Sequence, residues 1–547
     1  MTRFQHLQEG KDRYLLVPVM PTPNGGLHLG HLTGPYLKMD ILARAQRRNG
    51  SHVSIIFGSD GYESYTNLKA WQTGRDVKEL CQQFHAQMKK DLDALRIEYD
   101  DFINPLDAEH NTAFNAFLTA CVKALVNSGV AEIKNEKYLY SPDEDCFLTG
   151  CWIQGDCPQC GTGTGSYQCE DCGTQYRPMD LLAPKFKRGD YPLQEVDDKD
   201  LYLIINKKDE LLKHLAGMNM GQEFMDIAKT YLERQGNNVR LTNPGKWGTS
   251  FEIQDSSLPH VLFTYTALYF YSLYCGELYK KKFMAPLNPF HKNSKVITVA
   301  SFGIDCTIPY LVAGVACALE GNTCKPIDYL LPNHFFELEH SKFSTSRGHA
   351  IWGNDIANKT PVAADATRYF LAWKNPENEM CNFDVSQFMD FVNTKLAGKF
   401  QPMLTDTWEM INDQPIHFVK DELAETLEQL LINQHTYLTP PTFQLSKSTS
   451  VLKEWVNLNS KFAVDPNGAY WWLKGFALLA YPVMPDCSIS IWNMLGHSGA
   501  PLEKDYFQQT LVATGQKLPV YFTPISFYDI KPALPATLLS KQLETEK

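Results

Sequence analysis

The sequence predicts an α/β protein that opens on a parallel nucleotide-binding sheet and ends in a helical region. The apolar run from Leu15 to Met20 is typical of a buried strand that ends in a Pro/Gly turn, and Leu32 to Arg48 then has helical spacing. A second strand at Val53 to Phe57 completes a βαβ opening, and function is expected at its strand ends. From about Phe388 the pattern becomes helical. Because 547 residues exceed one compact core, we expect three to five structural units.

Composition and charge narrow the class of protein. The chain does not open on basic residues followed by an apolar run, and it has no uninterrupted apolar stretch long enough to cross a bilayer, so we expect a cytoplasmic protein outside the membrane. Four of the 14 cysteines form two CxxC pairs, which favours metal ligation over a disulfide framework. The formal net charge of −11 disfavours a broad nucleic-acid surface but is compatible with a local basic path.

Two histidines, His28 and His31, surround a glycine where the first strand gives way to its helix. Glycines in this turn let a nucleotide approach the backbone closely, and the start of a helix offers unpaired amides to phosphate. Imidazoles there can donate hydrogen bonds to a phosphoryl group as charge develops in the transition state. A lone pair of histidines near a turn is more often a surface or capping feature, so the interpretation needs a second motif.

The second motif is KFSTSRG, from Lys342 to Gly348, which follows an apolar strand-like segment. It predicts a small loop that carries two cations and several hydroxyls. Cations on such a loop can close over the β- and γ-phosphates of a nucleotide and stabilise pyrophosphate as it leaves. The two motifs together favour nucleotide chemistry over a surface role for the histidines.

HLGH at 28–31 resembles the HIGH signature of class I aminoacyl-tRNA synthetases, and KFSTS resembles their KMSKS loop. Further stretches resemble the methionyl-tRNA synthetase branch: GSDGYES at 58–64, the double CxxC knuckle, SKFSTSRGHAIWG and the tail YPVMPDCSISIW. The resemblance covers nearly the entire chain. It implies a Rossmann-like (HUP) catalytic domain with a zinc-knuckle insertion and a C-terminal α-helical bundle.

The resemblance also implies five regions along the chain. They are the first half of the catalytic domain, a connective insertion with the zinc knuckle, the second half of the catalytic domain, a stem-contact-like region with the KFSTS loop, and an anticodon-binding-like bundle, at residues 1–125, 126–250, 251–325, 326–388 and 389–547.

By resemblance, both motifs bind ATP, with Mg²⁺ on its phosphates. The implied catalytic residues are His28, His31, Lys342 and Arg347. The implied ATP-binding residues are Asn24, Gly25, Gly30, Ser344, Thr345 and Ser346. The family's second lysine in this loop is Thr345 here. Loss of one charge-assisted contact in a transition state would cost about 2 to 4 kcal/mol if nothing replaced it, so adenylate formation would be slower or would depend on Lys342 and Arg347.

The two CxxC pairs predict a zinc site. Each pair is followed by glycine, and each brings two thiolates to one tight knuckle whose backbone amides can point at sulfur. A four-cysteine site has no open coordination position, so we expect a structural role. The predicted ligands are Cys157, Cys160, Cys169 and Cys172.

The predicted amino-acid pocket has a carboxylate for the substrate ammonium, Asp60, at the end of the second strand, where the segment resembles the family's GTDEHG type. The other predicted pocket residues are Met20, Thr22, Thr264, Leu268, Tyr271 and Ala300. Thr22 stands where the family has an aromatic residue, and Thr264 where it has a stacking Trp. In the segment from Ala300 to Asp305 the family's histidine and lysine are absent. Losing aromatic walls removes contacts to a thioether worth about 0.3 to 1.5 kcal/mol each, so the pocket is predicted not to select methionine.

The C-terminal bundle lacks the usual cues for RNA binding. From Asp390 onward it has 12 Lys against 16 Asp plus Glu, and no arginine follows Arg368. The family's anticodon-reading Asn and Arg correspond to Pro402 and Asp406. Trp408 and Trp455 could stack on a base, but a Trp on an amphipathic helix is more often part of a core.

Two hypotheses for the acceptor remain open, and a third hypothesis is a role without catalysis. If the acceptor is tRNA, recognition comes from the acceptor stem or a partner protein. If it is a small molecule, the chain is similar to the synthetase-like part of hydrazine synthetases, in which an activated amino acid passes to a hydroxylamine, and a separate cupin-type protein would supply the remaining chemistry. The third hypothesis is a paralogue that binds an adenylate-like ligand without turnover.

Overall fold

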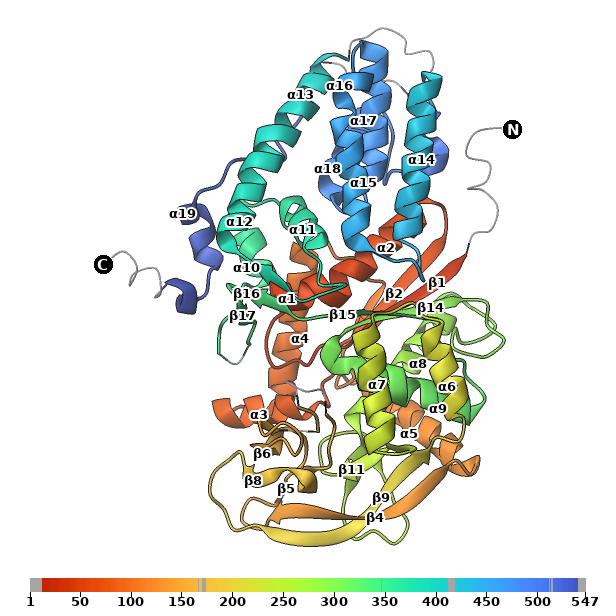
Figure 1. The fold of residues 1–547 in the computed structure, drawn as a ribbon, viewed down its shortest axis with the longest axis vertical. Helices are drawn as coiled ribbons and strands as arrows, with labels where there is room; N and C mark the ends of the chain where they lie inside the picture. The colour runs from red at the N-terminus through yellow and green to blue at the C-terminus, as the bar shows by residue number, and fades with distance from the viewer. Residues whose placement is uncertain are drawn as a thin grey trace.

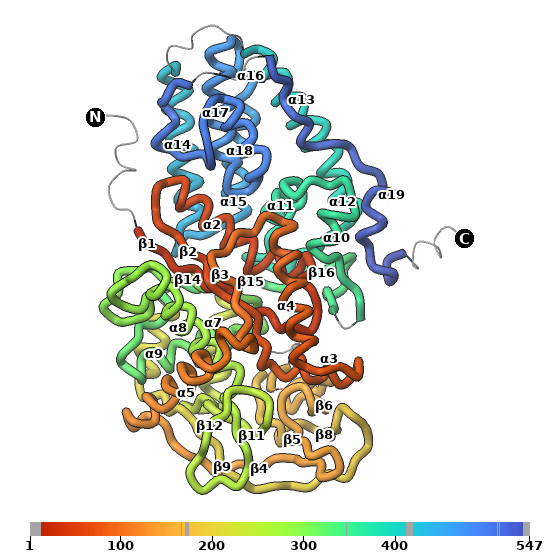
Figure 2. The backbone as a smooth tube through the Cα atoms, turned by 180° about the vertical axis from the view of Figure 1, so that it is seen from behind, coloured from red at the N-terminus to blue at the C-terminus, as the bar shows by residue number. Residues whose placement is uncertain are grey.

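The computed structural model describes residues 12–165, 167–169, 174–345, 347–411, 419–510, 512 and 515–539. A parallel sheet lies in the middle of the molecule, with the helical bundle on one side and the antiparallel strands of the insertion on the other (Figure 1). Figure 2, from behind, shows the C-terminal segment running along the outside of the bundle. The side-chain amide of Asn393 anchors this segment through bonds of 2.7 and 2.8 Å to the backbone of Ile525.

The central sheet has five strands, all parallel, in the order β15-β14-β1-β2-β3. Its central strand begins one residue after the start of the described chain, and Leu16 pairs with Val299 on one side and Ile55 on the other. Both strands predicted from the sequence are present and end within two residues of their predicted limits. The strands are β1 (Arg13–Pro18), β2 (His52–Gly58), β3 (Asp101–Ile103), β14 (Ile297–Gly303) and β15 (Tyr329–Asn333).

The helix predicted from Leu32 to Arg48 is present and has one more turn at its start. It consists of α1 (Leu29–His31), the π-helical η2 (Leu32–Tyr36) and α2 (Leu37–Arg48), joined without a break. The other helices around the sheet are α3 (Ser64–Thr73), α4 (Val77–Ala94), α5 (Asn111–Asn127), α8 (Thr264–Lys282), η5 (Ile304–Cys306), η6 (Ile308–Gly314) and α9 (Val315–Gly321).

One helical stretch, Ile304–Gly321, is long and apolar enough to cross a membrane. The sequence analysis expected no such stretch. In the structure 72% of it is buried inside the protein. It packs against α8 and against α7 (Gln222–Arg234) of the insertion. Its apolar composition is therefore accounted for by core packing.

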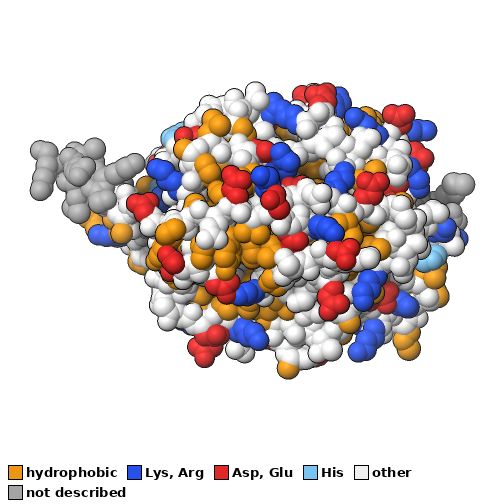
Figure 3. All heavy atoms as spheres, turned by 90° about the horizontal axis from the view of Figure 1, so that it is seen from below, with side chains coloured by type: hydrophobic (Ala, Val, Ile, Leu, Met, Phe, Trp, Pro, Cys, Tyr) orange, Lys and Arg blue, Asp and Glu red, His pale blue; other side chains and the backbone are white. Residues whose placement is uncertain are grey.

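The insertion between β3 and β14 contains three small antiparallel sheets, of which the largest is built on the long pair β4 and β9. On the face seen from below, acidic and basic side chains alternate around patches of hydrophobic side chains (Figure 3). The strands are β4 (Ala131–Ser141), β5 (Cys146–Phe147), β6 (Ile153–Asp156), β7 (Gly163–Gly165), β8 (Leu182–Phe186), β9 (Gln194–Ile204), β10 (Asn238–Arg240), β11 (Thr242–Pro244), β12 (Ser250–Phe251) and β13 (His260–Leu262). The remaining helices are η3 (Gly150–Trp152), η4 (Pro178–Asp180) and α6 (Lys208–Ala216).

A short sheet and a helical bundle follow β15. The sheet has the order β17-β16-β18, with β16 (Phe336–Leu338), β17 (Ser341–Lys342) and β18 (Cys381–Phe383). The helices are α10 (Gly353–Asn358), α11 (Ala364–Trp373), α12 (Val385–Asp390), η7 (Phe391–Phe400), α13 (Gln401–Glu409), α14 (Asp421–Tyr437), α15 (Leu445–Asn457), α16 (Asn459–Phe462), α17 (Pro466–Ala480), α18 (Pro485–Met494), η8 (Glu503–Asp505), α19 (Phe527–Ile530) and η9 (Lys531–Ala533).

Two tryptophans that could have stacked on a base belong to the bundle core. Trp455 is fully buried, and its ring stacks on Trp472 at a centroid distance of 6.1 Å. Trp408 is 6% exposed and donates its indole N–H to the Gln516 carbonyl at 2.8 Å. Both rings are therefore occupied by core contacts.

Two fully buried arginines attach the bundle to the sheet. Arg48, at the end of α2, bonds Glu503 at 2.8 Å and Gln434 at 2.6 Å. Arg368, in α11, bonds Asp40 of α2 at 2.7 Å as well as carbonyls on both sides of the contact. Because breaking a buried ion pair leaves an uncompensated charge, these bonds fix the bundle against the helix that carries the HLGH segment.

Candidate active site

The first signature lies at the start of α1, where β1 ends. His28 caps the helix: its Nδ1 accepts the backbone N–H of His31 at 3.2 Å. The two imidazoles stack with their centroids 3.6 Å apart. Burial lowers the pKa of His31 to about 4, and burial, with His31 adding to it, holds the pKa of His28 well below its usual range. Both rings are therefore neutral at pH 7, and His28 carries its proton on Nε2, which leaves that N–H to donate.

The second signature packs directly on the first. Phe343 stacks on His28 with a centroid distance of 4.8 Å, and a Cβ atom on Gly30 would lie 3.0 Å from the Phe343 ring. A Cβ atom on Gly25 would overlap the Thr345 methyl group. The segment after the loop continues the contact, because Ile351 accepts the N–H of Leu29 at 2.9 Å. The structure therefore joins two segments that are more than 300 residues apart into one site.

The two cations of the loop contact Phe335 and the loop backbone in this conformation. Lys342 Nζ lies 4.3 Å from the centroid of the Phe335 ring. Arg347 is exposed, and its guanidinium bonds the Lys342 carbonyl at 3.5 Å. Ser344 is half-buried, and Ser346 lies outside the described residues. Loops of this kind can close and bring their cations over bound phosphates.

A groove of about 500 Å³ runs beside the two signatures. It brings together the predicted residues Asn24, Gly25 and Thr345. Two lysines that the sequence analysis missed, Lys69 and Lys359, also line it. Nothing in the sequence marks these lysines, because α3 and α10 approach the groove only through the tertiary fold.

Asp60 follows β2 and lies in a desolvated position. Burial, and secondly the neighbouring Glu63 carboxylate, raise the pKa of Asp60 to about 7. Glu63 caps α3, where it accepts the Tyr65 N–H at 2.6 Å and the Ser64 hydroxyl at 3.0 Å. A cation bound at Asp60, such as a substrate ammonium, would favour its ionised form.

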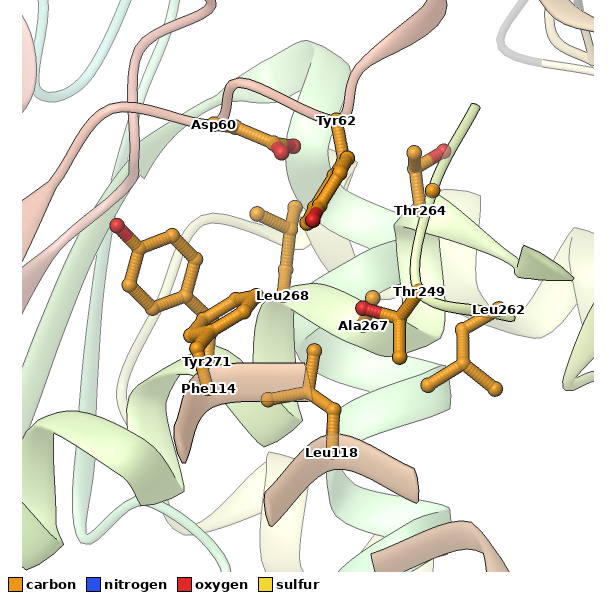
Figure 4. A pocket seen from close by; sticks show the side chains of 11 residues that line it. Asp60, Tyr62, Phe114, Leu118, Thr249, Leu262, Thr264, Ala267, Leu268 and Tyr271 are labelled. Atoms are coloured by element: carbon orange, nitrogen blue, oxygen red, sulfur yellow. The ribbon is translucent and has the colours of Figure 1, made fainter. Parts of the chain in front are cut away.

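Asp60 also lines a small pocket of about 20 Å³ between α5 and α8 (Figure 4). Of the predicted amino-acid-binding residues, the pocket contains Asp60, Thr264, Leu268 and Tyr271. It also contains residues that the sequence analysis did not name: Tyr62, Phe114, Leu118, Gly248, Thr249, Leu262 and Ala267. Most of these come from α5 and the β11–β13 sheet, which are distant in sequence from both signatures.

Three other predicted pocket residues lie outside this pocket. Met20 and Ala300 are 4% and 0% exposed and belong to the apolar core between the sheet and α8. Thr22 is half-buried in the turn after β1. One more group was missed: the hydroxyl of Tyr310 is buried, has no hydrogen-bond partner in the described part of the chain, and lies within electrostatic range of Asp60.

Three of the four predicted zinc ligands come together in the insertion. The sulfur atoms of Cys157, Cys160 and Cys169 lie within 4.8 Å of one another, and those of Cys160 and Cys169 are 3.6 Å apart. The N–H of Gln159 points at the Cys157 sulfur at 3.4 Å. Zn–S bonds of about 2.3 Å in a tetrahedron place sulfurs about 3.8 Å apart, so this spacing fits zinc. Cys172 lies outside the described residues.

Paired histidines at the start of a helix, a parallel sheet and a cation-bearing loop stacked on the histidines define a class I synthetase site. The family model for tRNA synthetases class I (M) matches residues 14–407, and the chain belongs to this family. A methionine–tRNA ligase of Protochlamydia amoebophila is 25% identical over 93% of this chain and 76% of its own length. The methionine–tRNA ligase of Chlamydia trachomatis serovar L2b is 26% identical over 88% of this chain and 92% of its own length. The Mycobacterium tuberculosis methionyl-tRNA synthetase bound by methionyl-adenylate shares the fold, with a TM-score of 0.68 at 16% identity over 94% of this chain and 99% of its own.

The raised pKa of Asp60 predicts the pH dependence of amino-acid use. Because only the ionised carboxylate binds an ammonium, kcat/KM for the amino acid should fall as the pH decreases through about 7 and level off above it. Glu63→Gln removes the neighbouring charge but keeps an oxygen to cap α3, so its midpoint should lie at lower pH. Amino-acid-dependent pyrophosphate exchange between pH 5.5 and 8.5 measures both midpoints. Glu79→Gln, which changes an exposed acid on α4, is the control, and equal midpoints in wild type and Glu63→Gln would contradict the assignment.

Proposed function

We propose that this protein uses ATP to activate the carboxylate of an α-amino acid. A carboxylate oxygen attacks the α-phosphorus of ATP, the bond to the β-phosphate bridging oxygen breaks, and an aminoacyl adenylate and pyrophosphate result. The observation that carries the proposal is the packing of Phe343 and Thr345 against His28 and Gly25. Through this contact, the two signatures that the family uses to bind ATP form a single site.

The geometry gives each group a part in this reaction. The neutral His28 donates through Nε2–H to the phosphoryl oxygens, and His31, stacked beside it, adds a second neutral ring. Asp60 holds the substrate ammonium and so orients the carboxylate. Lys342 and Arg347 move with their loop to neutralise the departing pyrophosphate, and Mg²⁺ on the phosphates supplies further charge neutralisation when bound.

We propose that the activated amino acid is not methionine. The relatives named above are methionine–tRNA ligases, and a solved neighbour holds methionyl-adenylate. In this chain the pocket beside Asp60 is lined by two threonines, Thr249 and Thr264, and its volume is about 20 Å³, room for one or two water-sized groups. A four-atom thioether side chain requires more apolar space than this.

Pyrophosphate exchange across the proteinogenic amino acids tests activation. His28→Asn, which can still cap the helix, should lower exchange by on the order of 10² to 10³ because it removes a donor to the phosphoryl group. Thr345→Lys adds a cation to the loop and should raise exchange. His52→Asn, an exposed histidine at the start of β2, is the control and should leave it unchanged. Absence of exchange with every amino acid would favour a non-catalytic paralogue, and methionine as the best substrate would overturn the pocket argument.

We propose that the cysteine cluster holds a structural zinc ion, with Cys172 as the fourth ligand. The purified protein should contain about one zinc per chain, as expected for a closed four-cysteine site. Cys157→Ser should lose the metal and lower the thermal midpoint, because metal binding and folding of such a knuckle are coupled. Cys146→Ser, another half-buried thiol of the insertion, should retain the zinc. Metal analysis that finds no zinc in wild type, or full zinc in Cys157→Ser, would contradict the site.

We also propose that the acceptor is a small nucleophile of the hydroxylamine type. Its nitrogen or oxygen would attack the acyl carbon of the adenylate, and AMP would leave. The supporting observation is the face of α13, where Pro402 and Asp406 are both exposed at the positions of the family's anticodon-reading pair. The bundle from Asp390 onward is net acidic, and its two candidate stacking tryptophans are buried. A net acidic surface repels phosphate.

Binding of total tRNA separates this proposal from tRNA charging. At physiological salt, the affinity for tRNA should be no tighter than the non-specific range of about 10⁻⁴ to 10⁻⁶ M, and no aminoacyl-tRNA should form. With the activated amino acid, added hydroxylamine should yield the aminoacyl hydroxamate and AMP with turnover. Tight, salt-sensitive tRNA binding together with charging would instead establish the function that the relatives' names describe.

A further inference from the structure

A hydrogen-bonded wall closes one side of the pocket beside Asp60. The phenol oxygen of Tyr62 accepts the side-chain N–H groups of Asn111 and Asn115 at 2.8 and 3.0 Å. The hydroxyl of Thr249 donates to Asn115 Oδ1 at 2.6 Å. Figure 4 places the hydroxyls of Tyr62 and Thr249 between Asp60 at one end of the pocket and Leu118 at the other.

The direction of each of these bonds is fixed by main-chain carbonyls. Asn111 Nδ2 also bonds the Pro105 carbonyl at 2.9 Å, and Asn115 Nδ2 also bonds the Asn111 carbonyl at 2.9 Å. A carbonyl oxygen only accepts, so the facing atoms must be the amide nitrogens. Asn115 Oδ1 is then an acceptor, and it takes the proton of Thr249.

The wall therefore offers one donor and one acceptor. Both lone pairs of Tyr62 Oη are used by N–H groups, so the phenol proton must be donated elsewhere. The Thr249 proton is already used, so its oxygen can still accept. The Tyr62 ring is held between Phe114 and Trp247, at centroid distances of 6.3 and 5.7 Å, which fixes the direction of its hydroxyl.

The remainder of the pocket is apolar and small. Its other walls include Phe114, Leu118, Leu262, Ala267 and Leu268, around a volume of about 20 Å³. A groove of about 590 Å³ shares the lining residues Tyr62, Gly248 and Thr249 with the pocket. The small volume of the pocket favours a short side chain.

We infer that the amino acid activated here carries a short hydroxylated side chain, as in serine or threonine; this rests on the adenylation proposed above. A hydroxyl accepts the Tyr62 proton and donates to Thr249, so it satisfies both groups with one oxygen. A methyl group or thioether leaves the Tyr62 donor without a good partner. A side-chain carboxylate would be repelled by the Thr249 oxygen and by the nearby Asp60, because a carboxylate only accepts hydrogen bonds. A side-chain ammonium only donates, so it could not accept the Tyr62 proton.

The test compares amino acids that differ by one hydroxyl, using pyrophosphate exchange by the full chain. Serine should exceed alanine, and threonine should exceed valine, by at least about tenfold in kcat/KM, because a site built to bond a hydroxyl discriminates strongly against its absence. Tyr62→Phe keeps the ring packing and removes the donor, and Thr249→Val removes the acceptor at nearly constant shape. Each variant should bring the serine-to-alanine ratio close to one, whereas Thr119→Val, on the outer groove, should leave the ratio unchanged.

The outcomes distinguish this inference from the proposed function. The inference is overturned, while adenylation stands, if pyrophosphate exchange is greatest with an apolar amino acid. The same holds if Tyr62→Phe leaves the serine-to-alanine ratio of kcat/KM unchanged. A complete absence of exchange in wild type, with every amino acid, overturns adenylation and the inference with it.

Discussion

The contact between the glycine-rich turn after β1 and the loop after β17 is the constraint on which the rest of the site depends. Phe343 lies on His28, and Thr345 fills the space that a side chain on Gly25 would occupy. Two segments separated by more than 300 residues can meet in this way because β1 is the central strand, β14 returns beside it, and β15 pairs with β14. The buried Arg48 and Arg368 hold the bundle against the same helix. The absence of side chains at Gly25 and Gly30 is thus required for this packing, and it also lets a nucleotide approach the backbone.

The site combines desolvated groups whose charge state responds to the ligand. Burial keeps His28 and His31 neutral, so they act as oriented hydrogen-bond donors rather than as fixed cations. Burial and Glu63 raise the pKa of Asp60, so its ionisation is favoured by the ammonium that it binds. In the described part of the chain, the buried hydroxyl of Tyr310 has no hydrogen-bond partner. The hydroxyl of Tyr62 accepts two N–H groups, so its own proton is available to a ligand. Groups arranged in this way need little reorganisation when the substrates arrive.

Much of the fold could be predicted from the sequence, because it depends on local pattern. The apolar run that became β1, the helical spacing that became η2 and α2, and the two signatures were all visible along the chain. The pocket walls were not visible along the chain. Phe114 and Leu118 lie on one face of α5, Thr249 lies just before β12, and only tertiary packing brings them to Asp60. Met20 and Ala300 were also predicted to line the pocket, but both lie in the apolar core beside the sheet.

The most direct measurement is the single-turnover rate of adenylate formation in Gly25→Ala, Thr345→Gly and the double variant. The methyl group added at position 25 would displace the loop, and misplacement of about 1 Å in an active site lowers rates by on the order of a hundredfold. We expect Gly25→Ala to show such a loss and Thr345→Gly, by removing the opposing methyl, to restore most of it in the double variant. A Gly25→Ala variant as fast as wild type, or a double variant whose losses simply multiply, would contradict the claim that this contact forms the site.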